Sequence, residues 1–93
     1  MIKIIGNDII NNGEKIGYIR DNDIFNVGGN KIGYYSGDDI FNYKGIKIGY
    51  LEGNYIKYEN GNRSISISEN KSRVNGGAIS NVCRAAIRLL FGD

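Results

Sequence analysis

The side chains that most often carry out chemistry in proteins are scarce in this chain. Its 93 residues include no histidine, which removes the commonest general base and the commonest metal ligand. The only cysteine, Cys83, falls among apolar residues, so we expect a buried and unreactive thiol. No combination of nucleophile, acid and base is visible in the sequence. We therefore expect a non-catalytic protein that holds neither a metal nor another cofactor.

Aspartate recurs at one position of an internal repeat. Asp8, Asp23 and Asp39 each stand immediately before an isoleucine. Three such carboxylates could form a ring around a cation, or each could stabilise a turn by accepting hydrogen bonds from the nearby backbone. We favour turns, because Asn54 occupies the corresponding neighbourhood of the next repeat. The stretch 21–23 also lacks the glycine and the distant glutamate of a calcium loop.

Tyrosine is the residue type best suited to bind a ligand here. Of the seven tyrosines, Tyr18, Tyr34 and Tyr50 occupy the same place in three repeats. Repeated aromatic rings can line pockets for a sugar, a nucleotide or a choline-like amine through stacking and cation–π contacts. Tyrosine is also a common packing residue between strands, with its hydroxyl in water. We favour packing and keep these three residues as candidate ligand-binding residues.

A repeat of about 16 residues organises most of the chain. Residues 24–39 read IFNVGGNKIGYYSGDD and residues 40–55 read IFNYKGIKIGYLEGNY, with nine of sixteen positions identical. The repeating units span residues 9–23, 24–39, 40–55 and, in degenerate form, 56–73. Each contains two short apolar runs separated by an Asn-Gly, Gly-Gly or Lys-Gly pair, which predicts a β-hairpin with a type I′ turn.

The alternation of side chains predicts which positions face the core. In the first complete unit Ile16 and Tyr18 would share one face and Gly17 the other. We expect the repeated isoleucines and tyrosines to form the buried ring, including the isoleucines that open the units, which are Ile9, Ile24, Ile40 and Ile56. The central glycines of the IGY triplets should lie where another backbone or an aromatic ring comes too close for a Cβ. These glycines are Gly17, Gly33 and Gly49.

Composition and repeat together predict a mainly β fold. The chain has 17 isoleucines against three leucines, 14 glycines and no proline. A lone hairpin is marginally stable in water, so we expect four or five hairpins to pack radially around a pseudo-symmetric axis. Residues 1–74 would form this ring, and residues 1–5 and 73–74 could pair to close it as a fifth petal.

The last part of the chain, residues 75–93, has helical periodicity. Its apolar stripe consists of Ile79, Val82, Cys83, Ala86 and Leu90. Arg84 and Arg88 mark a polar stripe. We expect one C-terminal helix that plugs or caps a face of the ring. Alternatively, Ile87, Leu90 and Phe91 could dock on a protein partner or on a second copy of the chain.

The hairpin unit DIFNYKGIKIGY, repeated four times before a Gly-Gly pair and an apolar terminal segment, resembles the bacterial β-flower families. These are small proteins in which four or five β-hairpins surround a pseudo-symmetric axis. The resemblance covers about residues 1–74 and implies the fold alone. It implies no activity and no site residues.

Charge and hydropathy narrow the function classes. The net charge is +2, and its 12 basic and 10 acidic residues form no block, which argues against nucleic acid and membrane surfaces as partners. The single cysteine and the absence of a long apolar run predict a cytoplasmic protein. We expect a protein-interaction or scaffold module, with a small-ligand binding module as the alternative.

Overall fold

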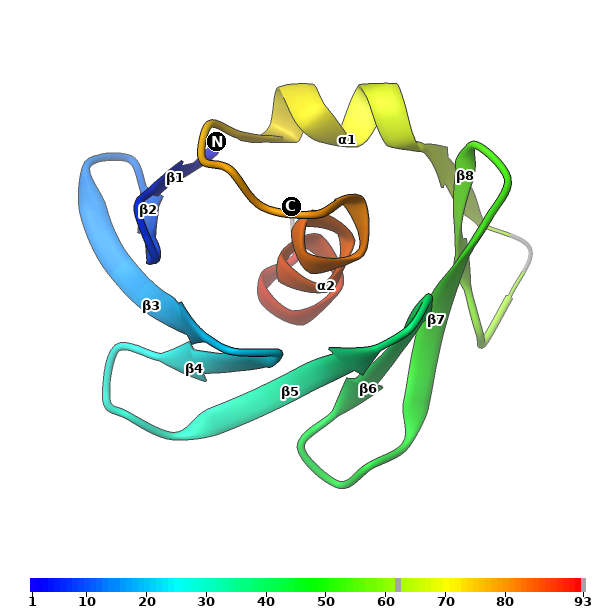
Figure 1. Cartoon of the computed structure of the whole chain (residues 1–93), viewed down its shortest axis with the longest axis horizontal. Helices are drawn as coiled ribbons and strands as arrows, with labels where there is room; N and C mark the ends of the chain where they lie inside the picture. The colour runs from blue at the N-terminus through cyan, green and yellow to red at the C-terminus, as the bar shows by residue number, and fades with distance from the viewer. Residues whose placement is uncertain (62, 93) are drawn as a thin grey trace.

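The computed structural model describes residues 1–61 and 63–92, and its strands form a ring around a helix (Figure 1). In the described ranges there are ten strands: β1 (Ile2–Ile5), β2 (Asp8–Asn11), β3 (Glu14–Arg20), β4 (Asp23–Asn26), β5 (Lys31–Ser36), β6 (Asp39–Asn42), β7 (Lys47–Glu52), β8 (Tyr55–Tyr58), β9 (Ser64–Ser66) and β10 (Val74–Asn75). The helices are α1 (Ile67–Arg73) and α2 (Asn81–Phe91). The predicted mainly β fold, built of hairpins with a C-terminal helix, is confirmed.

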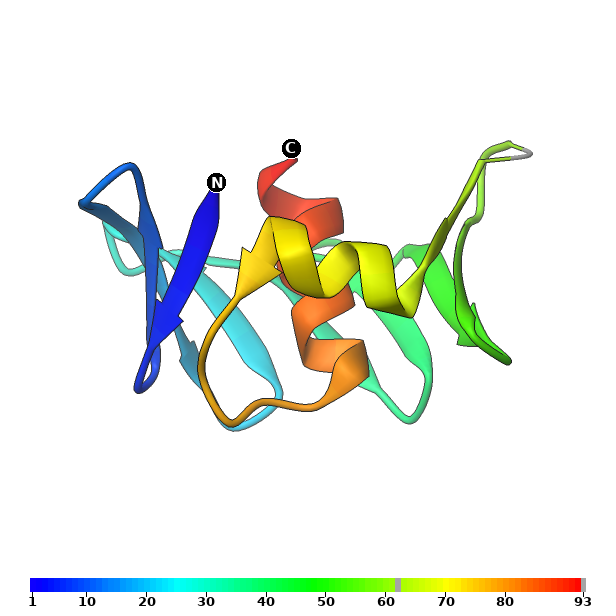
Figure 2. The same ribbon diagram turned by 90° about the horizontal axis from the view of Figure 1, so that it is seen from above.

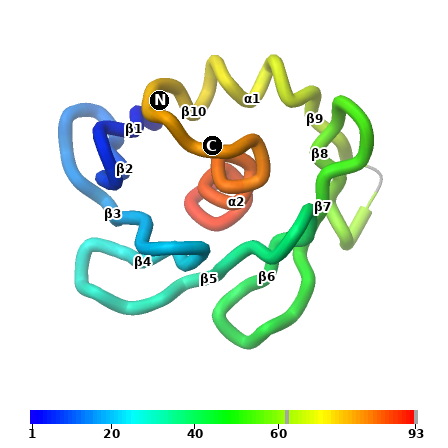
Figure 3. The backbone as a smooth tube through the Cα atoms, in the orientation of Figure 1, coloured from blue at the N-terminus to red at the C-terminus, as the bar shows by residue number. Residues whose placement is uncertain are grey.

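The hairpins belong to one continuous sheet. Its strand order is β10-β1-β2-β3-β4-β5-β6-β7-β8-β9, so each hairpin also bonds to the next. The sheet curls around α2, and α1 spans the interval between β9 and β10 (Figure 3). The two ends of the sheet differ in direction of pairing, because β10 runs parallel to β1 and places Val74 opposite Ile2. The predicted petals are therefore consecutive hairpins of one curled sheet.

A bulge in each of the first three repeats changes which side chains face inward. Between β2 and β3, Ile9 pairs with Gly17 but Ile10 pairs with Lys15, which leaves Ile16 as an extra residue. The same shift recurs between β4 and β5 and between β6 and β7. Because of the bulge, Ile16 packs against the core while Tyr18 lies on the outer face. The prediction that the IGY tyrosines join the buried ring is wrong.

The isoleucines that open the units form the core as predicted. Each has 0% of its surface exposed, and the four are Ile9, Ile24, Ile40 and Ile56. They follow one another around the ring, one in each incoming strand, and face α2. The sheet thus presents one equivalent apolar side chain per repeat to the helix at its centre.

Of the first three units, only the first has the predicted type I′ turn. There Asn12 and Gly13 both have positive φ, 53° and 81°. In the next two units only the second residue of the pair does, Gly29 at 88° and Gly45 at 78°. The Gly45 N–H donates to the Asn42 carbonyl at 3.0 Å, which is a three-residue loop that ends in a left-handed glycine. The fourth pair, residues 60–61, borders position 62, which lies outside the described residues.

The second strand of unit 56–73 is the short β9, and helix α1 replaces the rest of the unit after Ser66. Ser66 stands where the other units have the glycine of the IGY triplet, and its Oγ accepts a hydrogen bond from the Glu69 N–H at 3.0 Å. Serine followed three residues later by glutamate is a helix-start signal. The degenerate repeat therefore changes from strand to helix at Ser66.

Helix α2 lies inside the ring and runs along its axis (Figure 2). It begins at Asn81, six positions later than the expected segment, after Ser80 Oγ accepts from the Cys83 N–H at 3.1 Å. Six consecutive residues, 83–88, are buried, and these include Arg84 and Arg88 at 7% and 4% exposed. The expected polar stripe of the two arginines therefore lies inside the ring, with both side chains buried. The helix fills the ring and is enclosed on all sides.

Candidate functional site

The end of α2 packs directly on the repeat glycines. A Cβ on Gly33 would come within 2.6 Å of Leu90 Cδ1, and a Cβ on Gly17 within 2.7 Å of Phe91 Cζ. Gly49 is approached in the same way by Leu89. Each glycine also lies against the carbonyl oxygen of the neighbouring strand. The predicted close approach at these three glycines is confirmed.

This packing determines how much of each residue proposed for an interface is exposed. Ile87 is 0% exposed and belongs to the core of its own ring. Leu90 and Phe91 are half-buried and occupy the space above Gly33 and Gly17. Ile87 thus has no surface to offer a partner, and the other two contribute only what remains exposed at the end of the helix.

The opposite side of α2 binds the segment that closes the ring. Arg84 Nη1 donates to the Val74 carbonyl and to the Gly76 carbonyl, each at 2.7 Å, and Nη2 to the Gly77 carbonyl at 3.5 Å. One turn later, Arg88 Nη1 donates to Asn70 Oδ1 at 3.4 Å. The only sequence signal for this role was the spacing of the two arginines, which marked a polar stripe but not the groups that it contacts.

Cys83 is a poor candidate for nucleophilic chemistry. Its side chain is 1% exposed, and burial raises the pKa of the thiol above its usual value, although a hydrogen bond with Tyr35 acts in the opposite direction. Burial likewise raises the pKa of Tyr35. The thiol is therefore protonated at neutral pH, and the thiolate, which is the reactive form, is disfavoured.

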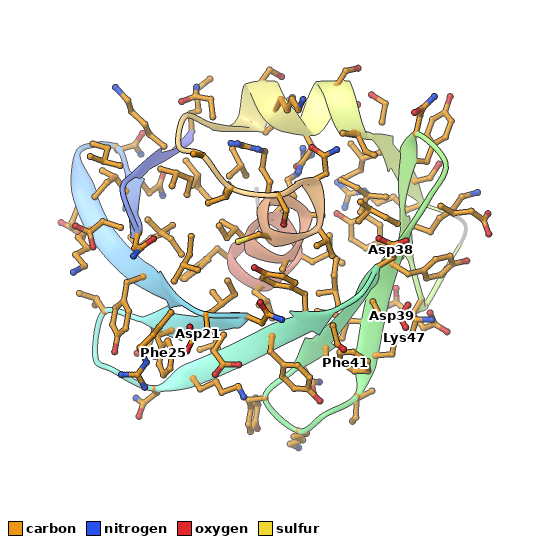
Figure 4. The ribbon with its side chains drawn as sticks, viewed as in Figure 1. Asp21, Phe25, Asp38, Asp39, Phe41 and Lys47 are labelled. Carbon is orange, nitrogen blue, oxygen red and sulfur yellow. The ribbon has the colours of Figure 1, made fainter. Side chains whose placement is uncertain are left out.

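The repeated aspartates lie on the outer face and form ion pairs. Asp8 pairs with Lys15 at 3.1 Å, and the next two repeats place the same pairs at 3.0 and 3.1 Å. These aspartates begin strands, so neither the cation ring nor the turn interpretation describes them. Within residues 1–61 and 63–92, no cluster of three or more acidic or cysteine side chains could hold a metal. Figure 4 shows the third pair, Asp39 and Lys47, away from α2.

The three candidate tyrosines have different neighbours. Tyr18 stacks on Phe25 and Tyr34 on Phe41, each with ring centroids 4.9 Å apart. Figure 4 places both phenylalanines on the side of the sheet turned away from α2. In the third repeat, the residue opposite Tyr50 is Lys57. Two of the three predicted tyrosines are therefore covered by packing, whereas Tyr50 has a cation in place of the covering ring.

A cavity of about 260 Å³ lies beside Tyr50. Its lining residues are Tyr50, Lys57, Tyr58, Gly61, Arg63 and Ser64. The Arg63 guanidinium lies 4.8 Å from the centre of the Tyr58 ring, and Lys47 Nζ lies 4.6 Å from the centre of the Tyr50 ring. The cavity lining combines two aromatic rings with two cations, and Lys47 lies over the Tyr50 ring.

Three exposed apolar side chains lie in loops at the end of the ring where α2 terminates, which we call the C-terminal rim. It comprises the β4–β5 and β6–β7 loops, residues 27–30 and 43–46, with the end of α2. Val27, Tyr43 and Ile46 are 62%, 67% and 56% exposed there. An adjoining groove of about 550 Å³ is lined by Ile46, Lys47, Ile48, Tyr58, Glu59, Asn60 and Leu89. In the part of the chain that the structure describes, no helix has the length and apolarity to span a bilayer.

Comparisons with known proteins agree with this architecture. The model of the 4-fold beta flower protein family matches residues 11–84, which is more than half of the chain. Neither the curated proteins nor the solved structures contain a match. The matched range begins in β2 and ends within α2, so it includes the repeats, the closing segment and the first arginine of the central helix. The chain therefore belongs to the 4-fold beta flower protein family.

Proposed function

We propose that the chain is a non-catalytic protein-interaction module whose contact surface is the C-terminal rim. The observation that supports this most is that Val27, Tyr43 and Ile46, each more than half exposed, lie in two loops at the same end of the ring. Single exposed apolar residues are normal on proteins, but a group beside an apolar groove is typical of an interaction site.

The partner that this surface fits best is a second copy of the chain. The opposite end of the ring carries Asp21 and Asp38 in its turns, with Ile5 and Tyr55 exposed beside them at 57% and 51%. The C-terminal rim carries Lys44, and Arg63 lies in the neighbouring β8–β9 loop. The two ends thus offer opposite charges and apolar surface to each other. Head-to-tail contact of this kind is heterologous, so copies would add in series.

Light scattering after size exclusion tests this proposal. We expect the mean mass to rise with protein concentration and to fall as salt is added, because screening weakens the charge contacts. Tyr43→Asp and Ile46→Asp should give monomers at all concentrations. Ser68→Asp, on the outer side of α1, is the matched control and should associate like the original chain. A strict monomer at millimolar concentration would contradict self-association, and a closed dimer would contradict the head-to-tail arrangement.

The cavity beside Tyr50 supports a second candidate function, a small-ligand binding module. Tyr50 lines this cavity, whereas Tyr18 and Tyr34 are covered by phenylalanine rings. A thermal-shift screen of sugars, quaternary amines and nucleotides tests it, since a ligand that binds only the folded state raises the midpoint of unfolding. If none of them raises it, the ligand-binding function should be abandoned.

A further inference from the structure

We propose that the cavity beside Tyr50 binds a small planar anion, that is, one aromatic ring carrying a phosphate or carboxylate group. This inference rests on the second candidate function and names its ligand class. The outer faces of the three repeats differ in the residue that lies opposite the tyrosine, which is Phe25, Phe41 and Lys57 in turn.

The first two repeats show what normally covers the tyrosine ring. Tyr18 and Phe25 are directly opposite each other on β3 and β4, with ring planes 6° apart. Tyr34 and Phe41 repeat this on β5 and β6, with planes 13° apart. In both repeats a lysine lies over the same tyrosine, at 5.4 and 4.6 Å from its centre. Each tyrosine therefore contacts both an aromatic ring and a cation.

The third repeat keeps the tyrosine and the cation but loses the second ring. Lys47 lies 4.6 Å from the centre of Tyr50, as Lys31 does from Tyr34. The position opposite Tyr50 is Lys57, and the cavity opens on this side. A planar ligand can stack on Tyr50 in the space that phenylalanine fills elsewhere, and base-like rings gain binding energy from such stacking.

The charges of the lining select an anion. Lys57 and Arg63 both line the cavity, and Ser64 adds a hydroxyl. Lys57 Nζ pairs with Glu52 Oε1 at the long distance of 3.8 Å, and the Glu52 side chain is 69% exposed. An ion pair this open is weak, so Lys57 can turn to a ligand at low cost. Arginine can hold a phosphate or a carboxylate through two parallel hydrogen bonds.

The size of the cavity limits the ligand to one ring system. Its volume of about 260 Å³ lies just below the range of roughly 300–1,000 Å³ that is usual for drug-sized ligands. An aromatic ring with a single acidic group fits this space. A phosphate alone would leave the Tyr50 face empty, and a neutral ring would gain nothing from the positive charges of the lining.

Phenyl phosphate is the probe that tests this proposal, by titration monitored in two-dimensional NMR spectra of the full chain. We expect saturable shifts centred on Tyr50, Lys57 and Ser64. Inorganic phosphate and phenol should each bind at least tenfold more weakly, because each lacks half of the contacts. Phenyltrimethylammonium should produce no shifts there, since the lining is cationic.

Three variants locate the site. Tyr50→Ala should weaken phenyl phosphate binding about tenfold or more, while the matched Tyr34→Ala, whose ring is covered by Phe41, should leave the dissociation constant unchanged. Lys57→Phe recreates the stacked pair of the other repeats. It should abolish binding while the protein stays folded, which separates loss of the site from loss of the fold.

The outcomes distinguish the inference from the function on which it rests. Preferential binding of phenyltrimethylammonium or of a sugar at Tyr50 would overturn the planar anion and keep a ligand-binding site. Equal binding of inorganic phosphate and phenyl phosphate would show that the ring contributes nothing and would also overturn it. If no probe shifts these residues, both the inference and the second candidate function are wrong.

Discussion

The hairpin arc, residues 2–66, and the closing segment, residues 67–77, bind the same helix by different chemistry. The arc brings bare glycine backbone against apolar side chains, as at Gly33 beneath Leu90. The closing segment brings backbone carbonyl groups to the guanidinium of Arg84. The arc is regular, and each of its described strands pairs with a neighbouring strand. The closing segment has fewer strand partners, so α2 supplies hydrogen bonds to it.

This difference explains why an amphipathic helix is stable when fully enclosed. Its apolar stripe faces the repeats, and its two arginines face the irregular interval that the repeats leave open. Buried charge is costly unless it is well hydrogen-bonded, and each arginine here has acceptors within reach. The apolar stripe of α2 therefore packs on the hairpin arc, and its arginine stripe binds the closing segment.

Removing the Arg84 contacts should have the largest effect. Arg84→Met keeps much of the volume but leaves the carbonyl groups of Val74 and Gly76 without their donor. Because an unsatisfied buried group costs about 1–3 kcal/mol, we expect the free energy of unfolding to fall by about 3 kcal/mol. Chemical denaturation measures this, and Arg84→Lys, which keeps the charge and one donor, should lose less. A change below about 1 kcal/mol for Arg84→Met would contradict the role assigned to this side chain.

Adding a methyl group at Gly33 tests the contact between α2 and the hairpin arc. In Gly33→Ala the new Cβ would meet the Phe41 carbonyl oxygen at 2.5 Å and Leu90 at 2.6 Å. Overpacking of this kind costs about 1–3 kcal/mol, which should appear as a lower denaturation midpoint. Gly61→Ala is the matched control, because no atom lies within 4 Å of its Cβ position and its φ is not positive. Equal stability of the Gly33 and Gly61 variants would show that α2 does not pack here.

The arc was far more predictable from the sequence than the closing segment. Ile24, Ile40 and the repeat glycines were assigned correctly because each position is written several times and strand alternation determines its face. The bulge at Ile16 has no clear signal, so Tyr18 was placed on the wrong face. Segment 67–77 occurs once, so no repeat indicates its structure. The contacts of Arg84 depend on how the helix is oriented inside the ring, which the sequence does not show.

The candidate site was likewise only partly predictable from the sequence. The sequence identified Tyr50 as one of three equivalent tyrosines, but it did not separate Tyr50 from Tyr18 and Tyr34. That distinction depends on strand register, which puts Lys57 opposite Tyr50 and phenylalanine opposite the others. Register comes from the bulges and loops, and these were the features the repeat predicted least well.

The helix start at Ser66 offers a smaller perturbation of the closing segment. Ser66→Ala removes the acceptor for the Glu69 N–H, so we expect a loss of about 1 kcal/mol in the free energy of unfolding. Ser36→Ala, at an exposed strand end, is the control and should change stability little. A loss confined to Ser66 would show that α1 is a folded part of the ring closure. No difference between the two variants would argue against it.

The smallest effect on stability at neutral pH is expected for Cys83, in the first turn of α2. Because its pKa is raised in the folded state, its contribution to stability is complete below the pKa of the unfolded thiol, about 8.5. That contribution is lost as the pH rises toward the folded value, since only the unfolded chain ionises readily. Thermal unfolding between pH 7 and pH 10 should show a steeper alkaline decline for the original chain than for Cys83→Ala. Parallel curves would contradict burial of the thiol.

Amide hydrogen exchange measured under native conditions tests the central claim most directly, namely that α2 is the core around which the ring closes. We predict that amides of residues 84–88 exchange as slowly as those of Ile24 and Ile40, through unfolding of the whole molecule, because the helix cannot be exposed without opening the ring. Fast exchange of α2 while the hairpin strands stay protected would contradict this account. It would mean that the sheet folds without the helix at its centre.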